Sequence, residues 1–188
     1  MTRRVLTALC SALLLFAGLA AVAPTAEAAL PSEQQWASDV NRAMAGSRVY
    51  VRQRVAQGGT RLAVNLDIDN TSLASHYAYG EPVPVVLRLA QYAESQGVTL
   101  LFNTGRVQGN GALAAVTRDL RRAGYAVTEI CGRSRSSQGL AEGKQRCRRH
   151  FVDEGYTIIA NVGNRSTDFV GGDYERAFRL PSYGNQLA

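Results

Sequence analysis

Between residues 61 and 162 the sequence alternates apolar stretches of strand length with longer stretches of helical periodicity. The strand-like stretches are 61–69, 98–103, 125–130 and 156–162, with a shorter fifth at 177–180. The helical patterns between them are 84–97, 111–123 and 143–154. Strands that alternate with helices predict an α/β fold, in which right-handed crossovers build a mainly parallel sheet.

The first 28 residues have the layout of a secretory signal peptide. Arg3 and Arg4 precede an apolar stretch, 5–23, and small residues at 26 and 28 follow it. This pattern predicts cleavage after Ala28 and a secreted, extracellular protein. The alternative is a membrane anchor, because nineteen apolar residues could just span a bilayer. The cleavage pattern directly behind them favours removal, so no stable membrane anchor is expected.

Removal of residues 1–28 leaves 160 residues, enough for one compact domain. We expect an N-terminal helical segment at 29–60, of one or two helices, and the α/β domain at 61–188. The lost residues include two arginines and one glutamate, so the formal charge falls from +6 to +5. This excess could attract anionic substrates. Because most of the basic residues are scattered, no nucleic-acid surface is expected.

Two cysteines, Cys131 and Cys147, stay in the mature chain. In an oxidising compartment they could form a disulfide, which would close a loop of about 15 residues and stabilise the fold by roughly 3 kcal/mol. The alternative is two reduced thiols, one in a strand and one in a helix. The sequence favours the disulfide.

Polar residues gather where the predicted strands end. They are Asp67 and Asp69 after the first strand, Thr104 after the second, and Asn164 and Asp168 after the fourth. The ligand crevice of a parallel α/β sheet lies outside the carboxyl ends of its strands. These separate segments therefore deliver their polar groups to one edge of one sheet.

Asp67 and Asp69 are the centre of this pattern. Residues two apart on a strand face the same side, and two carboxylates so close repel unless a cation or a shared proton joins them. Mg²⁺ would satisfy the pair. The alternatives are a solvated acidic turn or a calcium loop. An EF-hand fits poorly, because no glycine stands at the sixth position and Ala78 stands where the bidentate glutamate belongs.

Lys144 is the only lysine of the chain, beside twenty arginines. A lysine ammonium is a compact point charge on a flexible stem, which suits a phosphoryl group or crowded carboxylates. The alternative is chance, since a single lysine must fall somewhere. A phosphate-binding Walker loop at 139–144 fails, because its glycines are one residue too close and Gln145 replaces the required Ser or Thr.

Four short motifs follow one another along the chain. They are Asp67-x-Asp69-x-Thr71, the stretch 102–106, Lys144 followed by Gly155-Tyr156, and the stretch 163–168. With these motifs, residues 61–182 resemble the haloacid-dehalogenase (HAD) superfamily. Within it they are most similar to subfamily IIIB, the secreted acid phosphatases of the class B and plant vegetative-storage type.

The resemblance implies a Rossmann-like three-layer α/β/α sandwich and an Mg²⁺-dependent hydrolase of small phosphate monoesters. Only the 30 residues 72–101 separate the first two motifs, so no large cap domain is expected. The resemblance also implies an aspartyl-phosphate intermediate on Asp67, with Asp69 as general acid and base. Asp69 must then start neutral, which crowding by Asp67 would favour.

The resemblance also assigns binding roles. The residues implied to hold the metal are Asp67, Asp69, Asp168 and Asn164. Those implied to bind the phosphoryl group are Thr104, Gly105 and Lys144.

One departure from the family pattern is Asn164, where an aspartate is usual. An amide oxygen can ligate Mg²⁺ without charge, so the metal could bind more weakly, but we expect an active enzyme. Arg106, His76 and Tyr77 are candidates for the substrate side of the site, and packing or structural pairing is their alternative. Phosphotransfer to an alcohol and a catalytically weak binding or storage protein remain alternative functions. The sequence indicates no oligomeric state.

Overall fold

The computed structural model describes residues 29–109 and 111–187, so the predicted signal peptide lies outside the described residues. A five-stranded sheet with the order β3-β2-β1-β4-β5 occupies the middle of the fold, and every neighbouring pair of strands is parallel. The strands are β1 (Leu62–Leu66), β2 (Thr99–Val107), β3 (Glu129–Arg133), β4 (Thr157–Gly163) and β5 (Arg176–Arg179). The predicted mainly parallel sheet is confirmed.

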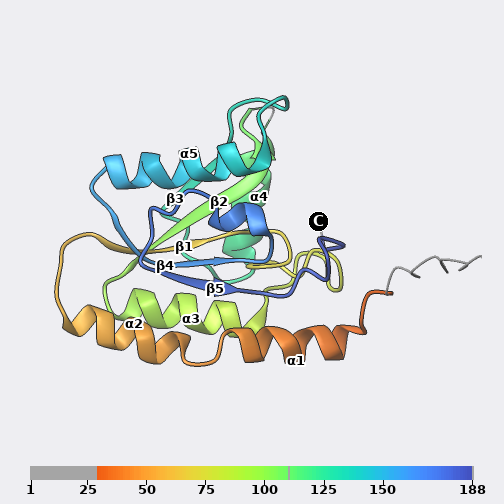
Figure 1. Cartoon of the computed structure of the whole chain (residues 1–188), viewed down its shortest axis with the longest axis horizontal. Coiled ribbons are helices and arrows are strands. Elements are labelled where there is room, and N and C mark those ends of the chain that lie inside the picture. Colours follow the sequence, from red (N-terminus) through yellow and green to blue (C-terminus); the bar gives the residue numbers. More distant parts are fainter. Residues whose placement is uncertain (1–28, 110, 188) are drawn as a thin grey trace, which may run out of the picture.

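Helices cover both faces of the sheet (Figure 1). They are α1 (Glu33–Ala43), α2 (Ser47–Ala56), α3 (Pro84–Ser95), α4 (Ala112–Arg122), α5 (Leu140–Asp153) and the short 3₁₀ helix η1 (Ser166–Phe169). Helix α5 packs on one face through Cys147 and Phe151. The apolar residues of α1 to α4 join the larger cluster on the other face. The three-layer α/β/α sandwich is therefore confirmed.

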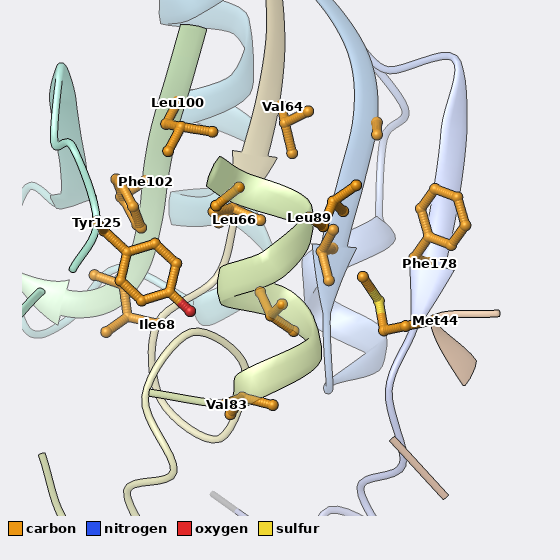
Figure 2. Packing of buried hydrophobic residues seen from close by; sticks show 14 of the residues in the cluster. Met44, Val64, Leu66, Ile68, Val83, Leu89, Leu100, Phe102, Tyr125 and Phe178 are labelled. Atoms are coloured by element: carbon orange, nitrogen blue, oxygen red, sulfur yellow. The ribbon is translucent and has the colours of Figure 1, made fainter. Parts of the chain in front are cut away.

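Alternating side chains of the strands feed these two clusters. Ala63 and Leu101 face α5, whereas Val64, Leu66 and Leu100 belong to the larger cluster (Figure 2). This is the period of two that a strand imposes, and it buries both faces of the central strands. All five residues of β1 are buried, so the strand that leads to Asp67 is held from both sides.

The N-terminal segment shares the larger cluster. Helix α1 begins after Ser32, whose hydroxyl accepts a hydrogen bond from the backbone N–H of Gln35 at 3.2 Å. Its Trp36 is buried and stacks on Tyr77, with 4.9 Å between the ring centroids. In α2, the hydroxyl of Tyr50 donates to the backbone carbonyl of Ile159 in β4 at 2.9 Å. Residues 29–60 thus pack on the sheet of the α/β domain.

The third strand and the fifth helix begin elsewhere than the sequence predicted. The predicted strand 125–130 was wrong in its first residues, since β3 starts only at Glu129. Tyr125 instead lies just after the end of α4, where its N–H donates to the carbonyl of Leu120 and its ring packs edge-on against Phe102 (Figure 2). Helix α5 starts three residues before the predicted start, at Leu140, so Lys144 lies in its second turn.

The connections reverse direction between β1 and β4. From β1 the chain proceeds outward to β2 and β3, and then returns through α5 to β4 on the other side of β1. Such a switch point leaves a crevice at the carboxyl ends of the two central strands.

Between β1 and α3 the chain runs through residues 67–83 without a helix, so no large cap domain is inserted there. In the part of the chain that the structure describes, no helix has the length and apolar character needed to cross a membrane.

The predicted disulfide is confirmed. Cys131 in β3 and Cys147 in α5 are bonded, with 5.6 Å between their Cα atoms. Both cysteines are buried in the smaller cluster, where the bond ties the edge of the sheet to the helix that carries Lys144.

Replacing both cysteines with alanine should lower the free energy of unfolding by about 3 kcal/mol, because the unfolded chain regains the entropy of an open loop. Urea unfolding of the oxidised protein and of the double variant measures the difference. A reductant should destabilise the wild-type protein and leave the variant unaffected. Equal unfolding midpoints for the two oxidised proteins would contradict the prediction.

Candidate active site

A cavity of about 340 Å³ opens at the carboxyl ends of the strands. The predicted site residues that line it are Asp67, Asp69, Gly105, Arg106, Lys144 and Asn164. They come from four segments that follow β1, belong to β2, lie in α5 and follow β4. The fold therefore brings together the groups that the sequence placed at one edge of the sheet.

Asp67 is held rigidly at the end of β1. Its N–H donates to the carbonyl of Val162 in β4 at 2.9 Å, so the backbone is still paired there. Its carboxylate accepts a hydrogen bond from the Thr71 hydroxyl at 2.9 Å, and the hydroxyl of Ser72 donates to its carbonyl at 2.6 Å. Asp67 is only 6% exposed. The side chain is thus oriented before any ligand arrives.

Lys144 reaches Asp67 from the second turn of α5. Its buried ammonium contacts the Asp67 carboxylate, lies 2.8 Å from a carboxylate oxygen of Asp168 and donates to the carbonyl of Asn103 at 2.9 Å. The side-chain amide of Asn103 donates in turn to the carbonyl of Lys144 at 2.8 Å. An ammonium has three N–H groups, and here they meet three oxygens. The predicted meeting of the lone lysine with the acids is present in the structure.

Two buried carboxylates share this single ammonium. Burial and the nearby Asp168 charge raise the pKa of Asp67 to about 6, although Lys144 acts in the opposite direction. Burial lowers the pKa of Lys144, but the two carboxylates outweigh it and hold that pKa above its ordinary value. The ammonium therefore stays charged and leaves one negative charge in excess. A proton or a cation would neutralise it.

The oxygens around this charge suit a hard divalent cation. Asn164 is buried, and its side-chain N–H₂ donates to the carbonyl of Leu187 at 3.0 Å. Its amide oxygen is buried without a hydrogen-bond partner among the described residues, and an unpaired buried oxygen is costly. Together with the carboxylates of Asp67 and Asp168 it forms an all-oxygen set of the kind that Mg²⁺ prefers. These residues fit the predicted metal.

Asp168 approaches the end of β4 so closely that only glycine fits beneath it. A Cβ atom at Gly163 would lie 2.4 Å from a carboxylate oxygen of Asp168. The same carboxylate accepts a hydrogen bond from the N–H of Arg165 at 2.8 Å. The glycine at the start of the fourth motif is thus explained by packing.

Asp69 corrects one expectation. The chain leaves the strand after Leu66, and Asp69 forms a two-bond ion pair with Arg106, at 2.7 and 3.1 Å. The hydroxyl of Ser75 donates to it as well, at 2.9 Å. Burial raises the pKa of Asp69, but the hydrogen bonds and charge of Arg106 outweigh burial and leave that pKa below its ordinary value. The expectation that crowding by Asp67 keeps Asp69 neutral was therefore wrong.

Of the two predicted phosphate-binding residues in β2, Gly105 and Thr104, only Gly105 reaches the cavity. Gly105 lines the cavity, whereas Thr104 is fully buried and is not among the lining residues. The Thr104 hydroxyl accepts a hydrogen bond from the N–H of Arg106 at 3.2 Å. Strand β2 also continues through this motif to Val107, where the sequence had ended it at 103. The phosphate-binding role of Thr104 stays a prediction.

His76 and Tyr77 do not line this cavity. The Tyr77 hydroxyl donates to the carbonyl of Pro31 at 2.8 Å, and its ring stacks on Trp36 and makes an edge contact with the ring of His76. The backbone N–H of His76 donates to the side chain of Asn70. Packing, the alternative that the sequence left open for these two residues, describes their positions. Arg106, the third candidate, does line the cavity.

Sequence reasoning missed Arg133, Leu140, Arg165 and Thr167, which also line the cavity. Arg133 donates to the carbonyls of Gly105, Ser136 and Gln138 at 2.6 to 3.0 Å and so fixes the loop before α5. The chain has twenty arginines, and no sequence signal distinguishes Arg133 from the others. Arg165 is marked only by its position directly after Asn164.

A second group of ligand atoms lies at the opposite edge of the sheet. Glu129, His150 and Glu154 bring their side-chain atoms within 4.8 Å of one another. Glu129 is the first residue of β3, and Glu154 follows the end of α5, so the group belongs to the amino ends of the strands. None of these three residues lines the cavity.

Comparisons with known proteins show the family and the fold of the chain. The sequence model of one family, described as HAD superfamily, subfamily IIIB (acid phosphatase), matches residues 80–186, more than half of the chain. Among solved structures, the class C acid phosphatase from Bacillus anthracis is similar to 84% of this chain, over 80% of its own length, with a TM-score of 0.62 and 18% sequence identity. At this identity the likeness concerns the fold. No curated protein gives a significant sequence match.

Proposed function

Because the chain belongs to subfamily IIIB of the HAD superfamily, the acid phosphatases, we propose that it is a secreted, Mg²⁺-dependent enzyme that forms an aspartyl-phosphate on Asp67. The observation that carries the proposal is the buried contact of Lys144 with Asp67, at the cavity wall, and with Asp168, which lies behind the lining residues. It fixes a carboxylate where a phosphate ester can reach it.

The reaction takes place in two displacements at phosphorus. An oxygen of Asp67 bonds to phosphorus while the bond to the leaving alcohol breaks, and Asp69 gives its proton to that alcohol. Asp69 then takes a proton from water, whose oxygen attacks phosphorus and releases Asp67 and inorganic phosphate. Lys144 and the backbone at Gly105 hold the phosphoryl oxygens. Orientation and charge of this kind supply most of the catalysis in phosphoryl transfer.

Asp67, Asp168, the Asn164 amide oxygen and the main-chain carbonyl of Asp69 would hold Mg²⁺. When bound, the ion supplies positive charge that offsets the charge of the phosphoryl group. The unpaired Asn164 oxygen supports this assignment, since a cation would give it a partner.

The disulfide supports the proposed export. Disulfides persist in oxidising compartments and are rare in the cytosol, and the Cys131–Cys147 bond is built into the packed layer under α5. Together with the signal-peptide pattern of residues 1–28, it favours an extracellular enzyme.

Hydrolysis of an aryl phosphate by residues 29–188, with and without Mg²⁺, tests the proposed function. We expect activity that a chelator abolishes and Mg²⁺ restores. Because Asp67 must lose its proton before it can bind a cation, protons compete with the metal below a pH of about 6. The half-saturating Mg²⁺ concentration should therefore rise by about tenfold per pH unit below that value. Activity indifferent to chelators would contradict the metal requirement.

The Asp69–Arg106 pair predicts an acidic pH optimum. Asp69 can donate a proton only while protonated, and the pairing keeps its pKa low, so the rate should fall as pH rises. Arg106→Met removes the pairing charge and should move this alkaline limb to higher pH by about one unit or more.

The pH profile of kcat checks the Arg106 prediction, with Arg122→Met as the matched control. Arg122 is exposed on α4, and among the described residues its one ion-pair partner is Asp119. Each pH profile is first scaled to its own maximum, so that a general loss of rate in Arg106→Met does not affect the comparison. The pH at which kcat falls on the alkaline side is then compared between the variants and the wild type. An unmoved limb would show that Arg106 does not set the pKa of Asp69 during turnover.

The uncharged Asn164 favours a second candidate, a catalytically weak binding or storage protein on the same scaffold. Absence of hydrolysis with every divalent cation tested, together with tight binding of vanadate, would support it. Phosphotransfer is separated from hydrolysis by adding glycerol and measuring glycerol phosphate.

A further inference from the structure

The charges that line the cavity do not balance. Four cationic side chains and two anionic ones line it. Arg106 pairs with Asp69, and Lys144 pairs with Asp67 and with Asp168 behind it. Within residues 29–109 and 111–187, neither Arg133 nor Arg165 has a carboxylate within ion-pair distance. Arg133 and Arg165 are therefore two positive charges at the cavity wall without a direct ion-pair partner, and the one negative charge in excess beside Lys144 offsets only one of them.

These two arginines differ in what their guanidinium groups already bind. Arg133 donates to three carbonyls of its own loop and of β2, so its geometry is committed to the fold. Arg165 has no such network, and its partly buried side chain lines the cavity beside Asn164. Its backbone is nevertheless fixed, because its N–H donates to Asp168 at 2.8 Å. The Arg165 guanidinium is thus available to bind an anion, and its backbone is held in place by Asp168.

We propose that Arg165 forms a subsite for a second anionic group of the substrate. The inference rests on the proposed function, in which the phosphoryl group that reacts occupies Lys144 and Asp67. A guanidinium presents a planar fork of donors that matches a carboxylate or a phosphate. The preferred substrates are then phosphate monoesters that carry a carboxylate or a second phosphate.

The size of the cavity limits the distance between the two anionic groups. Ligand cavities range from about 300 to 1,000 Å³, and this one, about 340 Å³, is at the small end. A compact substrate of three to six carbons fits that volume, with its second anion only a few bonds from the phosphate ester. Arg133, whose Nε and one terminal nitrogen already donate to carbonyls, adds its positive charge to the attraction.

Two matched pairs of substrates test the subsite. Glycerol 3-phosphate and 3-phosphoglycerate differ only in a terminal CH₂OH or carboxylate, and fructose 6-phosphate and fructose 1,6-bisphosphate differ by a second phosphate. We expect kcat/KM to be about tenfold higher or more for the doubly anionic member of at least one pair, as for a charge-assisted hydrogen bond. The pair that shows the preference identifies the anionic group.

Arg165→Gln should reduce this preference ratio to about one, whatever happens to the absolute rates. Arg165→Lys, which keeps the charge without the fork, should retain part of it. Arg122→Gln removes one positive charge far from the cavity and should leave the ratio unchanged, which separates local binding from the attraction of net charge. Thermal unfolding shows whether each variant is folded.

A wild-type ratio near one in both pairs, or an unchanged ratio in Arg165→Gln, would overturn the subsite. If the two members are hydrolysed equally well in both pairs, only the subsite fails and the phosphatase proposal stands. If none of the four compounds is hydrolysed at any Mg²⁺ concentration, the proposed function fails and the subsite with it.

Discussion

Asp67→Asn should lower kcat by at least about 10³-fold, the scale expected when a nucleophile is removed. The amide has nearly the shape of the carboxylate and can still accept the hydrogen bond of Thr71, but its oxygen does not form a stable bond to phosphorus. The variant should also fail to accumulate a phosphorylated protein after rapid acid quenching with a labelled substrate, which the wild-type enzyme should show.

Loss of fold would not explain that result. The pKa of Asp67 is raised, so the folded protein disfavours its ionised form, and the ionised carboxylate costs stability once the pH exceeds about 6. A neutral amide removes this cost. We therefore expect the melting temperature of Asp67→Asn at pH 7 to equal or exceed that of the wild type. A variant that keeps a tenth of the activity would exclude Asp67 as the nucleophile.

Lys144→Met should both inactivate and destabilise the protein. It leaves the carboxylates of Asp67 and Asp168 buried side by side without their ammonium, and breaking such a buried pair costs about 3–5 kcal/mol. Without the lysine nothing opposes the burial and the Asp168 charge that raise the pKa of Asp67, so this carboxyl binds its proton more tightly than in the unfolded chain. The variant should therefore gain stability as the pH falls from 7 to 5, when Asp67 becomes neutral.

Denaturant unfolding at pH 7 and pH 5 measures this effect. The double variant Lys144→Met with Asp67→Asn should recover part of the lost stability, because only one buried charge remains. Added Mg²⁺ should recover part of it in the single variant. If Lys144→Met unfolds like the wild type at pH 7, the ammonium does not stabilise these carboxylates and the electrostatic account of the site is wrong.

The sequence predicted most of the features that depend on the course of the backbone. Apolar strands of the right length end at Asp67 and Asn164, and parallel strands must bring such ends to one edge of a sheet, so the meeting of these residues with Lys144 could be anticipated. The disulfide could be anticipated too, although with an alternative, because compartment and loop length both favoured it.

The features that the sequence could not predict depend on which side chains meet in the folded protein. Asp69 pairs with Arg106 because the chain bends after Leu66, and strand periodicity says nothing about residues beyond a strand. Tyr125 has the β propensity of a strand residue, but packing against Phe102 outweighs it. Arg165 could not be singled out, since its importance comes from a missing counter-charge.

The hydrogen bond between Asn164 and Leu187 decides which atom the amide presents to the cavity. A carboxylate at this position would offer oxygen in either orientation, whereas a carboxamide offers oxygen in one flip and an N–H₂ group, which repels a cation, in the other. The carbonyl of Leu187 captures the nitrogen and so selects the useful flip. In the proposed metal site, an uncharged ligand would then depend on a segment far along the chain, and we expect metal affinity to be sensitive to trimming or tagging near residue 187.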